Sequence, residues 1–184
     1  DVERSRGLGD VYKRQGSHGH DRDLRFWLYT GGAATRIDLA EIRFTSEGWG
    51  ELIEARLTLV GAIHQVLQAR IINGDSVTAI KTAYYQLRSL WIWADANNKP
   101  LTIEGIQQTF IAWANEDVWH EANVGKSTTA RSAWNVASSV AGIISRALET
   151  HHGHAVVQPR WLMRHTRLNF PKGKQRPNEK TLQG

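Results

Sequence analysis

The sequence contains no cysteine among its 184 residues, and it has only four prolines. Without cysteine, disulfide bonds and thiolate metal ligands are excluded. No apolar stretch approaches the roughly 18 residues that a membrane-spanning helix requires, and the chain does not open with the residue series of a signal peptide. These absences predict a soluble, cytoplasmic protein with no membrane partner. A chain of this length can bury a hydrophobic core large enough to hold its fold.

Positive charge is concentrated near the C-terminus. The formal net charge is +5, but residues 16–157 contain twelve basic and fourteen acidic side chains, whereas residues 158–184 contain seven basic side chains and one acid. This distribution predicts a nearly neutral body followed by a basic segment. Such a segment suits nucleic acid, and a solvated tail without a partner has the same composition.

The N-terminal region offers little evidence of regular structure. Residues 5–15, SRGLGDVYKRQ, resemble the in-frame translation of a sequencing-library adapter. Residues 1–15 are therefore interpreted as an adapter-derived artefact and excluded from the prediction of fold and function, as an expression tag would be. Residues 16–45 lack a sustained hydrophobic period, so we predict an irregular segment with room for a short strand or helical turn.

Apolar residues at steps of three and four predict four amphipathic helices between residues 46 and 158. The predicted helices span about 46–72, 76–96, 102–114 and 127–150. We expect a looser stretch at 115–125 between the third and fourth helices. The sequence thus predicts an all-α fold, a small four-helix bundle, with a basic linker over residues 159–184.

Several features of the helical region follow the order seen in one protein family. The segment 76–96 begins with Ser and Thr and carries Tyr84, Leu87 and Trp93, and the last helix opens with Gly125-Lys126-Ser127-Thr128-Thr129-Ala130-Arg131. Together with the basic segment that follows, residues 46–174 resemble the N-terminal core-binding, SAM-like domain of tyrosine-type site-specific recombinases, the phage integrase family.

The resemblance implies that the chain binds double-stranded DNA and acts in DNA integration and recombination. It also implies that residues 159–184 lead toward a catalytic domain missing from this chain, and that the full-length parent assembles as an oligomer on DNA. In the family, helices of this domain approach the major groove. Contacts must then come from polar residues that lie off the apolar faces of the helices.

Two groups of polar residues meet that requirement. Hydroxyl, amide, ammonium and guanidinium groups at helical spacing can meet successive phosphates. The free N–H groups at the start of the last helix, with Lys126 and Ser127, also predict a phosphate site. The predicted DNA-binding residues are Thr78, Lys81, Tyr85, Arg88, Lys126, Ser127, Thr128, Arg131 and Asn135. Solvated helix faces look alike in sequence, so a helical protein-interaction module with a disordered basic tail is the alternative hypothesis.

Catalytic residues are not predicted. Tyrosine recombinases attack a phosphodiester with a tyrosine hydroxyl, while basic side chains neutralise the developing charge. Their pattern includes His-x-x-Arg, and none of the eight histidines has arginine three residues later; His165 and Arg167 are one residue too close. Because Tyr84 and Tyr85 lie inside a predicted helix, no tyrosine fits the nucleophile. The chain is predicted not to be an enzyme by itself.

Cofactor and metal sites are not predicted either. Gly125-Lys126-Ser127 resembles the end of a phosphate loop, but position 120, where the first glycine belongs, is histidine. His151, His152 and His154 lack the rigid scaffold that a metal site needs. Most of the eight tryptophans are expected to pack in the core, and Trp161, within the basic segment, is the exception.

Overall fold

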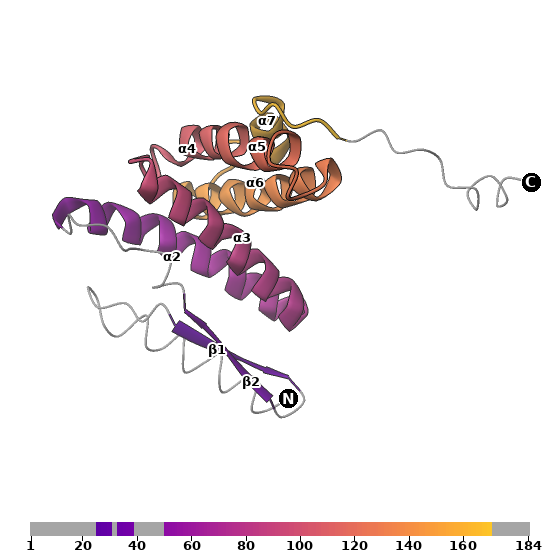
Figure 1. Cartoon of the computed structure of the whole chain (residues 1–184). Coiled ribbons are helices and arrows are strands. Elements are labelled where there is room, and N and C mark those ends of the chain that lie inside the picture. The colour runs from indigo at the N-terminus through magenta and orange to yellow at the C-terminus, as the bar shows by residue number, and fades with distance from the viewer. Residues whose placement is uncertain (1–24, 31–32, 39–49, 171–184) are drawn as a thin grey trace, which may run out of the picture.

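The computed structural model describes residues 25–30, 33–38 and 50–170, with side chains placed from residue 56 onward. The helices pack into a small all-α bundle, so the predicted fold class is confirmed (Figure 1). The elements are β1 (Arg25–Thr30), β2 (Ala33–Asp38), α2 (Gly50–Ile72), α3 (Val77–Ala96), α4 (Ile106–Trp113), the π-helical η2 (Ala114–Val118), α5 (Trp119–Asn123), α6 (Ala130–His152) and α7 (Pro159–Arg164). The adapter-like segment 1–15, the predicted helix start at Ser46 and residues 171–184 of the predicted linker lie outside the described residues.

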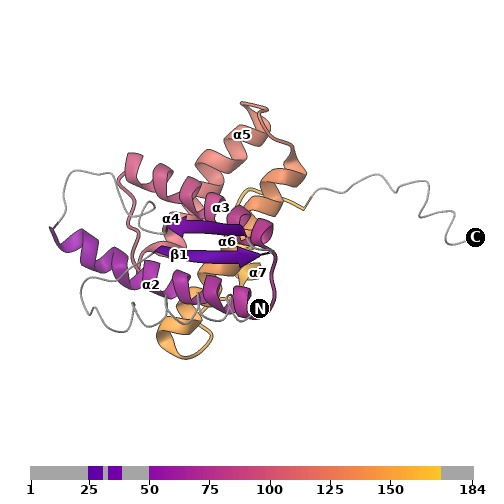
Figure 2. The same cartoon turned by 90° about the horizontal axis from the view of Figure 1, so that it is seen from below.

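A β-hairpin precedes the bundle, where the sequence predicted an irregular segment. Strands β1 and β2 are antiparallel, with Arg25 opposite Asp38 and Thr30 opposite Ala33. In the sequence, Gly31-Gly32 separates the two strands, and Gly-Gly is a pair that two-residue hairpin turns favour. The hairpin lies on the side of α2 and α3, away from α7 (Figures 1 and 2).

Helices α2 and α3 form an antiparallel pair, and the predicted end of α2 and the predicted span of α3 are confirmed. The turn between them places Gly74 at φ +96°, a conformation that glycine adopts without strain. Ser76 caps α3, because its hydroxyl oxygen accepts a hydrogen bond from the N–H of Ala79 at 3.1 Å. At the other end of the pair, Arg56 of α2 forms a salt bridge with Asp95 of α3.

The predicted loose stretch at 115–125 is wrong for most of its length. Helix α4 runs into η2 and then α5 without a break, so helical structure continues to Asn123. The polar run Asn115-Glu116-Asp117 favoured a loop in the sequence, but Ala114 and Val118 are buried on either side of it. Tertiary packing therefore overrides local propensity, and the extra residue of a π-turn accommodates the polar side chains.

Helix α6 begins three residues later than predicted. Thr129 is its N-cap, with its side-chain oxygen accepting from the N–H of Ser132 at 3.1 Å. The helix ends at Gly153, whose φ of +79° lets its N–H donate to the carbonyl of Glu149. Ala130 is exposed at the first helical position.

The predicted linker is wrong for residues 159–168, which pack on the bundle. Pro159 starts the short helix α7, at a position that proline favours. Leu162, Met163 and Leu168 are buried, and the hydroxyl of Ser145 fixes the preceding segment by donating to the carbonyl of Val157 at 2.6 Å. The basic charge of this segment predicted a linker, but its apolar residues anchor it to the bundle. The body of the protein therefore extends about ten residues further than predicted.

The core is formed by α2, α3, α4, η2, α6 and α7, and Trp119 and Ala122 of α5 pack against it. Trp91 and Trp113 are its largest fully buried side chains, with Phe110 in contact with Trp113. Burying a large apolar side chain contributes about 1.5–3 kcal/mol, so these aromatics carry much of the stability. Among the described residues, no helix is long and apolar enough to cross a membrane.

Candidate nucleic-acid interface

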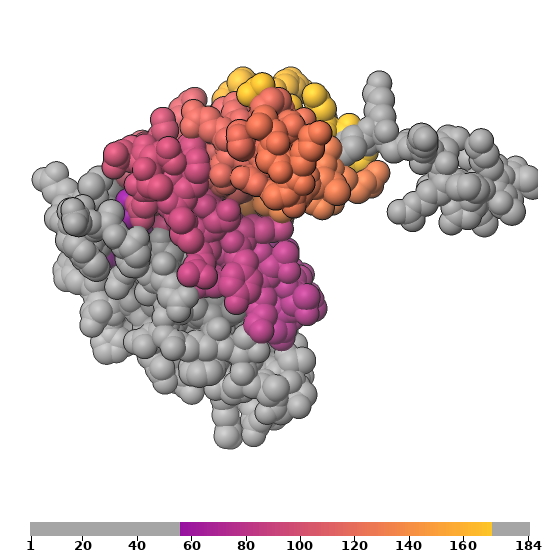
Figure 3. All heavy atoms as spheres, in the orientation of Figure 1, coloured from indigo at the N-terminus to yellow at the C-terminus, as the bar shows by residue number. Residues whose placement is uncertain are grey.

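The structure places the nine predicted DNA-binding residues at the surface. Thr128 is half-buried and the other eight are exposed. Four of them lie on α3, and the other five lie on the segment that leads into α6 and on its first turns. Figure 3 shows α3 and the beginning of α6 on one face of the molecule. We name this surface the α3–α6 face and define it as Thr78, Lys81, Tyr85, Arg88, Lys126, Ser127, Thr128, Arg131 and Asn135.

The cations of the α3–α6 face have no carboxylate partner. The salt bridges within the part that has placed side chains involve Arg56, Arg70 and His120, and none involves a cation of this face. Lys81, Arg88, Lys126 and Arg131 are therefore exposed without a carboxylate within 4 Å. Exposed cations that are not neutralised internally are suited to phosphate.

The phosphate site predicted at Lys126 and Ser127 does not form as expected. The N–H of Ser127 donates to the carbonyl of Glu121 at 2.9 Å, because these residues close the end of α5 rather than start α6. The Ser127 hydroxyl donates to the carboxylate of Glu121. With both donors of Ser127 engaged, Lys126 is the residue at this corner that can meet an anion. Lys126 itself has φ +52°.

The C-terminal segment returns over the first turns of α6. Phe170 packs edge-on against Trp134, with ring centroids 4.9 Å apart, and the guanidinium of Arg131 lies 5.9 Å from the centre of the Phe170 ring. This cation–π contact restricts the orientation of the Arg131 side chain, while its charge stays exposed. This segment thus helps to shape the α3–α6 face.

An acidic group lies beside the basic residues of α3. Asp117 lines a shallow pocket with Tyr85, Arg88 and Trp93. Burial raises the pKa of the Asp117 carboxyl above its ordinary value, and the nearby charge of Glu121 raises it further, while Trp113 and His120 act in the opposite direction. The raised pKa reduces the tendency of Asp117 to ionise beside this surface.

The variant Asp117→Asn is expected to be more thermally stable than the wild type at neutral pH. Because the folded state holds the Asp117 proton more tightly than the unfolded state, ionising this group costs stability once the pH exceeds the ordinary value of 3.8. This loss of stability is absent at pH values below 3.8 and reaches its full size at pH values above the raised pKa of Asp117 in the folded state. The difference in Tm between the two proteins should therefore grow from pH 4 to pH 7.

Thermal melts followed by circular dichroism across this range measure the effect. Asparagine has nearly the same shape as aspartate, so the substitution changes charge more than contacts. Glu104→Gln, which removes an exposed carboxylate, is the charge-matched control and should change Tm little. A constant difference in Tm at every pH would contradict the prediction.

A second basic group lies on α7 and just after it, in the segment that the sequence predicted to be a basic linker. Arg160, Trp161 and Arg164 project from α7, and the guanidinium of Arg167 lies 3.4 Å from the centre of the Trp119 ring. The N–H of Arg167 also donates to the side-chain oxygen of Asn115 at 2.6 Å. Pro159 followed by adjacent apolar residues was the sequence signal for this helix.

The histidines at the end of α6 lie at the surface. The rings of His151 and His152 meet edge to face at 4.8 Å, and the Nδ1 of His154 lies 3.2 Å from the carbonyl oxygen of His152. Within residues 56–170, no group of three or more metal-ligating side chains has the geometry to hold an ion.

No protein-family model, curated protein sequence or solved structure matches this chain.

Proposed function

We propose that this chain binds double-stranded DNA through the α3–α6 face, as the core-binding domain of a tyrosine-type site-specific recombinase that acts in DNA integration and recombination. The chain has no catalytic role in this proposal. Cleavage and oligomeric assembly on DNA belong to the full-length parent.

The observation that carries the proposal is the set of exposed, unpartnered cations on α3 and at the start of α6. Lys81 and Arg88 lie seven residues apart on one helix, which corresponds to about two turns or 10 Å. Lys126, which precedes α6, and Arg131, in the first turn of α6, are two further exposed cations. Because phosphate contacts dominate the affinity of DNA-binding proteins, such a surface favours a polyanion.

Polar neighbours on the same face suit DNA better than a diffuse anion. Tyr85 is 57% exposed, and its ring meets the buried Tyr84 edge to face at 5.3 Å, which fixes its direction. Thr78 and Asn135 add a hydroxyl and an amide that can contact phosphate or base edges. Asp117 and Glu121 border the face and would disfavour phosphates at that edge, which limits the contact area to the cationic part.

Salt-dependent binding to a duplex tests the proposal. A fluorescently labelled duplex of about 20 base pairs, titrated with the full chain at 50 and 200 mM salt, should be bound at low salt and lose affinity steeply at high salt, because bound phosphates release counterions. Replacing the four basic residues of positions 171–184, in the variant K172Q/K174Q/R176Q/K180Q, should weaken binding but leave a measurable, salt-dependent affinity.

Absence of binding by the full chain at 50 mM salt would refute the proposal. Loss of all binding in the C-terminal variant would show that the bundle does not read DNA, and it would favour the alternative function.

The alternative is a helical protein-interaction module, and one observation favours it. Ile92 is 58% exposed beside the half-buried Trp93, and both line the pocket of about 490 Å³ that holds Tyr85 and Arg88. Tyrosine, tryptophan and arginine are the residues that contribute most at protein interfaces. If the chain is a protein-interaction module, the variant Ile92→Ser should abolish association with its protein partner. The same variant should have no effect on DNA binding.

A further inference from the structure

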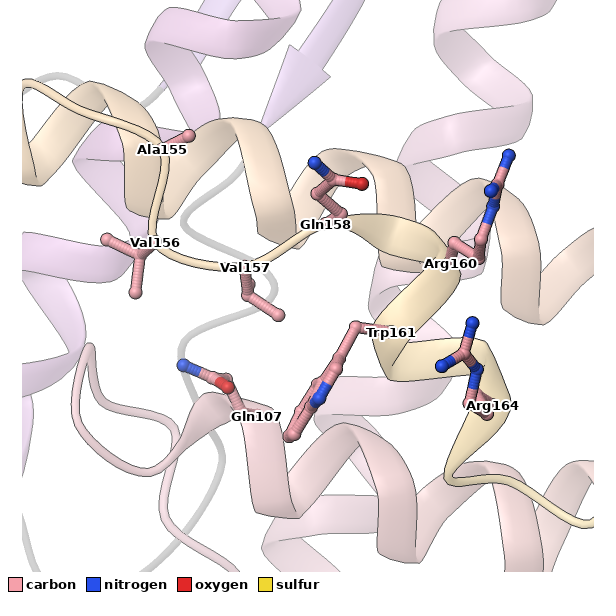
Figure 4. A pocket seen from close by; sticks show the side chains of 8 residues that line it. All are labelled: Gln107, Ala155, Val156, Val157, Gln158, Arg160, Trp161 and Arg164. Atoms are coloured by element: carbon pink, nitrogen blue, oxygen red, sulfur yellow. The ribbon is translucent and has the colours of Figure 1, made fainter.

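A second surface hollow lies between α7, the segment before it and α4. Its volume is about 520 Å³, within the range of small-molecule sites. Figure 4 shows its lining side chains converging from these elements. They are Gln107, Ala155, Val156, Val157, Gln158, Arg160, Trp161 and Arg164. Aromatic, aliphatic, amide and cationic groups are thus brought together, and no carboxylate is among the described residues that line it.

Trp161 contributes the largest side chain that lines this hollow. It extends from α7 toward α4, where the amide of Gln107 lies near it (Figure 4). His165 stacks on the indole with ring centroids 4.1 Å apart and an angle of 37°, yet Trp161 remains 41% exposed. The Nδ1 of His165 lies 2.8 Å from the carbonyl oxygen of Trp161, which holds the imidazole in place. A tryptophan supported from one side and open to solvent can stack a planar ring.

The neighbourhood of Trp161 is fixed by the fold. Leu162 and Met163, the next two residues, are buried and anchor α7 on the bundle. On the opposite wall, the hydrogen bond from Ser145 to the carbonyl of Val157 holds the segment before α7. The hollow is therefore preformed, which reduces the entropy cost of binding.

Two arginines give the hollow its charge. Arg160 and Arg164 lie four residues apart on α7, and their side chains project to the same side of the helix (Figure 4). Both line the hollow together with Trp161. Both are exposed, and neither has a carboxylate within 4 Å among the residues with placed side chains. Guanidinium groups bind phosphate through paired N–H donors, so this pair can hold a phosphate next to a ring stacked on Trp161.

We propose that this hollow binds a nucleotide, with the base stacked on Trp161, the base edge at the Gln107 amide and the phosphate at Arg160 and Arg164. An amide both donates and accepts hydrogen bonds, as a base edge does. The nucleotide comes either from solution or from a DNA strand in which one base is unpaired. Because the site lies on α7, outside the α3–α6 face, it does not depend on the function proposed for that face.

Binding of 2′-deoxyadenosine 5′-monophosphate to the full chain tests the site itself. Saturation-transfer NMR should detect contact with the adenine protons, and Trp161→Ala should weaken binding about tenfold or more, because base–aromatic stacking is lost. Trp161→Phe keeps an aromatic ring and should retain part of the affinity. R160Q/R164Q should also weaken binding, whereas Arg146→Gln, which removes an exposed arginine outside the hollow, should not.

A second arm distinguishes the source of the nucleotide. A duplex with one unpaired adenosine is compared with the same duplex fully paired. If the site takes a base from a DNA strand, the wild type should prefer the first duplex about tenfold, and Trp161→Ala should remove the preference while leaving affinity for the paired duplex. Binding of the free nucleotide without that preference supports the site and assigns it to nucleotides in solution.

Two results would overturn the proposal. One is that neither the mononucleotide nor the unpaired duplex binds in a way that depends on Trp161. The other is that inorganic phosphate competes equally well in wild type and Trp161→Ala and accounts for all binding, which would leave a simple anion site. Thermal melts of each variant serve as the control for folding. We expect each variant to remain folded, because Leu162 and Met163, which anchor α7, are unchanged.

Discussion

The variant Asp95→Ala is expected to lose about 3–5 kcal/mol of folding free energy, because it removes a carboxylate partner from the nearly buried cation of Arg56. Both side chains are nearly buried, with 9% and 11% of their surfaces exposed. The pair joins α2 to α3 across 39 positions of sequence, so its loss also loosens the packing of these two helices. Urea denaturation followed by circular dichroism measures the change.

A second ion pair provides the matched control. Arg70 and Asp75 are 2.8 Å apart, and each side chain is 35% exposed. Asp75→Ala removes the same charge from a solvated pair, so it should cost less than about 1 kcal/mol. Equal losses in the two variants would contradict the argument that burial of Arg56 is the cause.

The double variant Arg56→Leu/Asp95→Leu separates the cost of losing the Asp95 carboxylate from the contribution of the pair as a whole. Replacing both partners with apolar residues removes both charges together, and such replacements are often close to neutral. We expect the double variant to be more stable than Asp95→Ala. If it is less stable, the contacts of Arg56 with its other neighbours matter more than its charge.

The largest expected effect on function is the loss of DNA affinity in the variant K81Q/R88Q/K126Q/R131Q. All four cations are exposed on the α3–α6 face without carboxylate partners, so their replacement should leave the fold intact. If each meets one phosphate, the slope of log affinity against log salt should fall by about 3–4. The affinity near 100 mM salt should fall on the order of a hundredfold or more. Fluorescence anisotropy with a labelled duplex at several salt concentrations measures both quantities.

The C-terminal variant K172Q/K174Q/R176Q/K180Q removes the same number of positive charges and is therefore the control. It should lose less affinity than the face variant if the phosphates lie on α3 and α6. Equal losses in the two variants would indicate attraction to net charge alone, and the α3–α6 face would then have no special role.

The helical bundle was predictable because its information is local. Apolar residues at steps of three and four, with Ser76 as a cap and Asn73-Gly74 as a stop, predict α3 and the end of α2 correctly. The surface positions of Lys81, Tyr85 and Arg88 follow from the same periodicity, since residues off the apolar stripe must face solvent. Their position relative to Arg131 could not be derived, because it depends on how α6 packs against α2 and α3.

The errors occur where local signals conflict with packing. Residues 115–123 are polar enough to predict a loop, but burial of Ala114 and Val118 keeps them helical. Ser127 looked like part of a helix start, yet its N–H and hydroxyl both bond to Glu121 at the end of the preceding helix. These hydrogen bonds join segments whose register the sequence pattern does not define.

The sequence by itself determined the class of fold, the order of the main helices and the exposure of the basic residues, because hydrophobic periodicity and helix caps act over a few residues. Only the tertiary structure decided that residues 159–168 belong to the body of the protein. Leu162, Met163 and Leu168 gain enough by burial to hold a segment whose charge and proline predicted a linker. The same packing brings Trp161 toward Gln107, 54 positions earlier in the chain, and no local pattern encodes that contact.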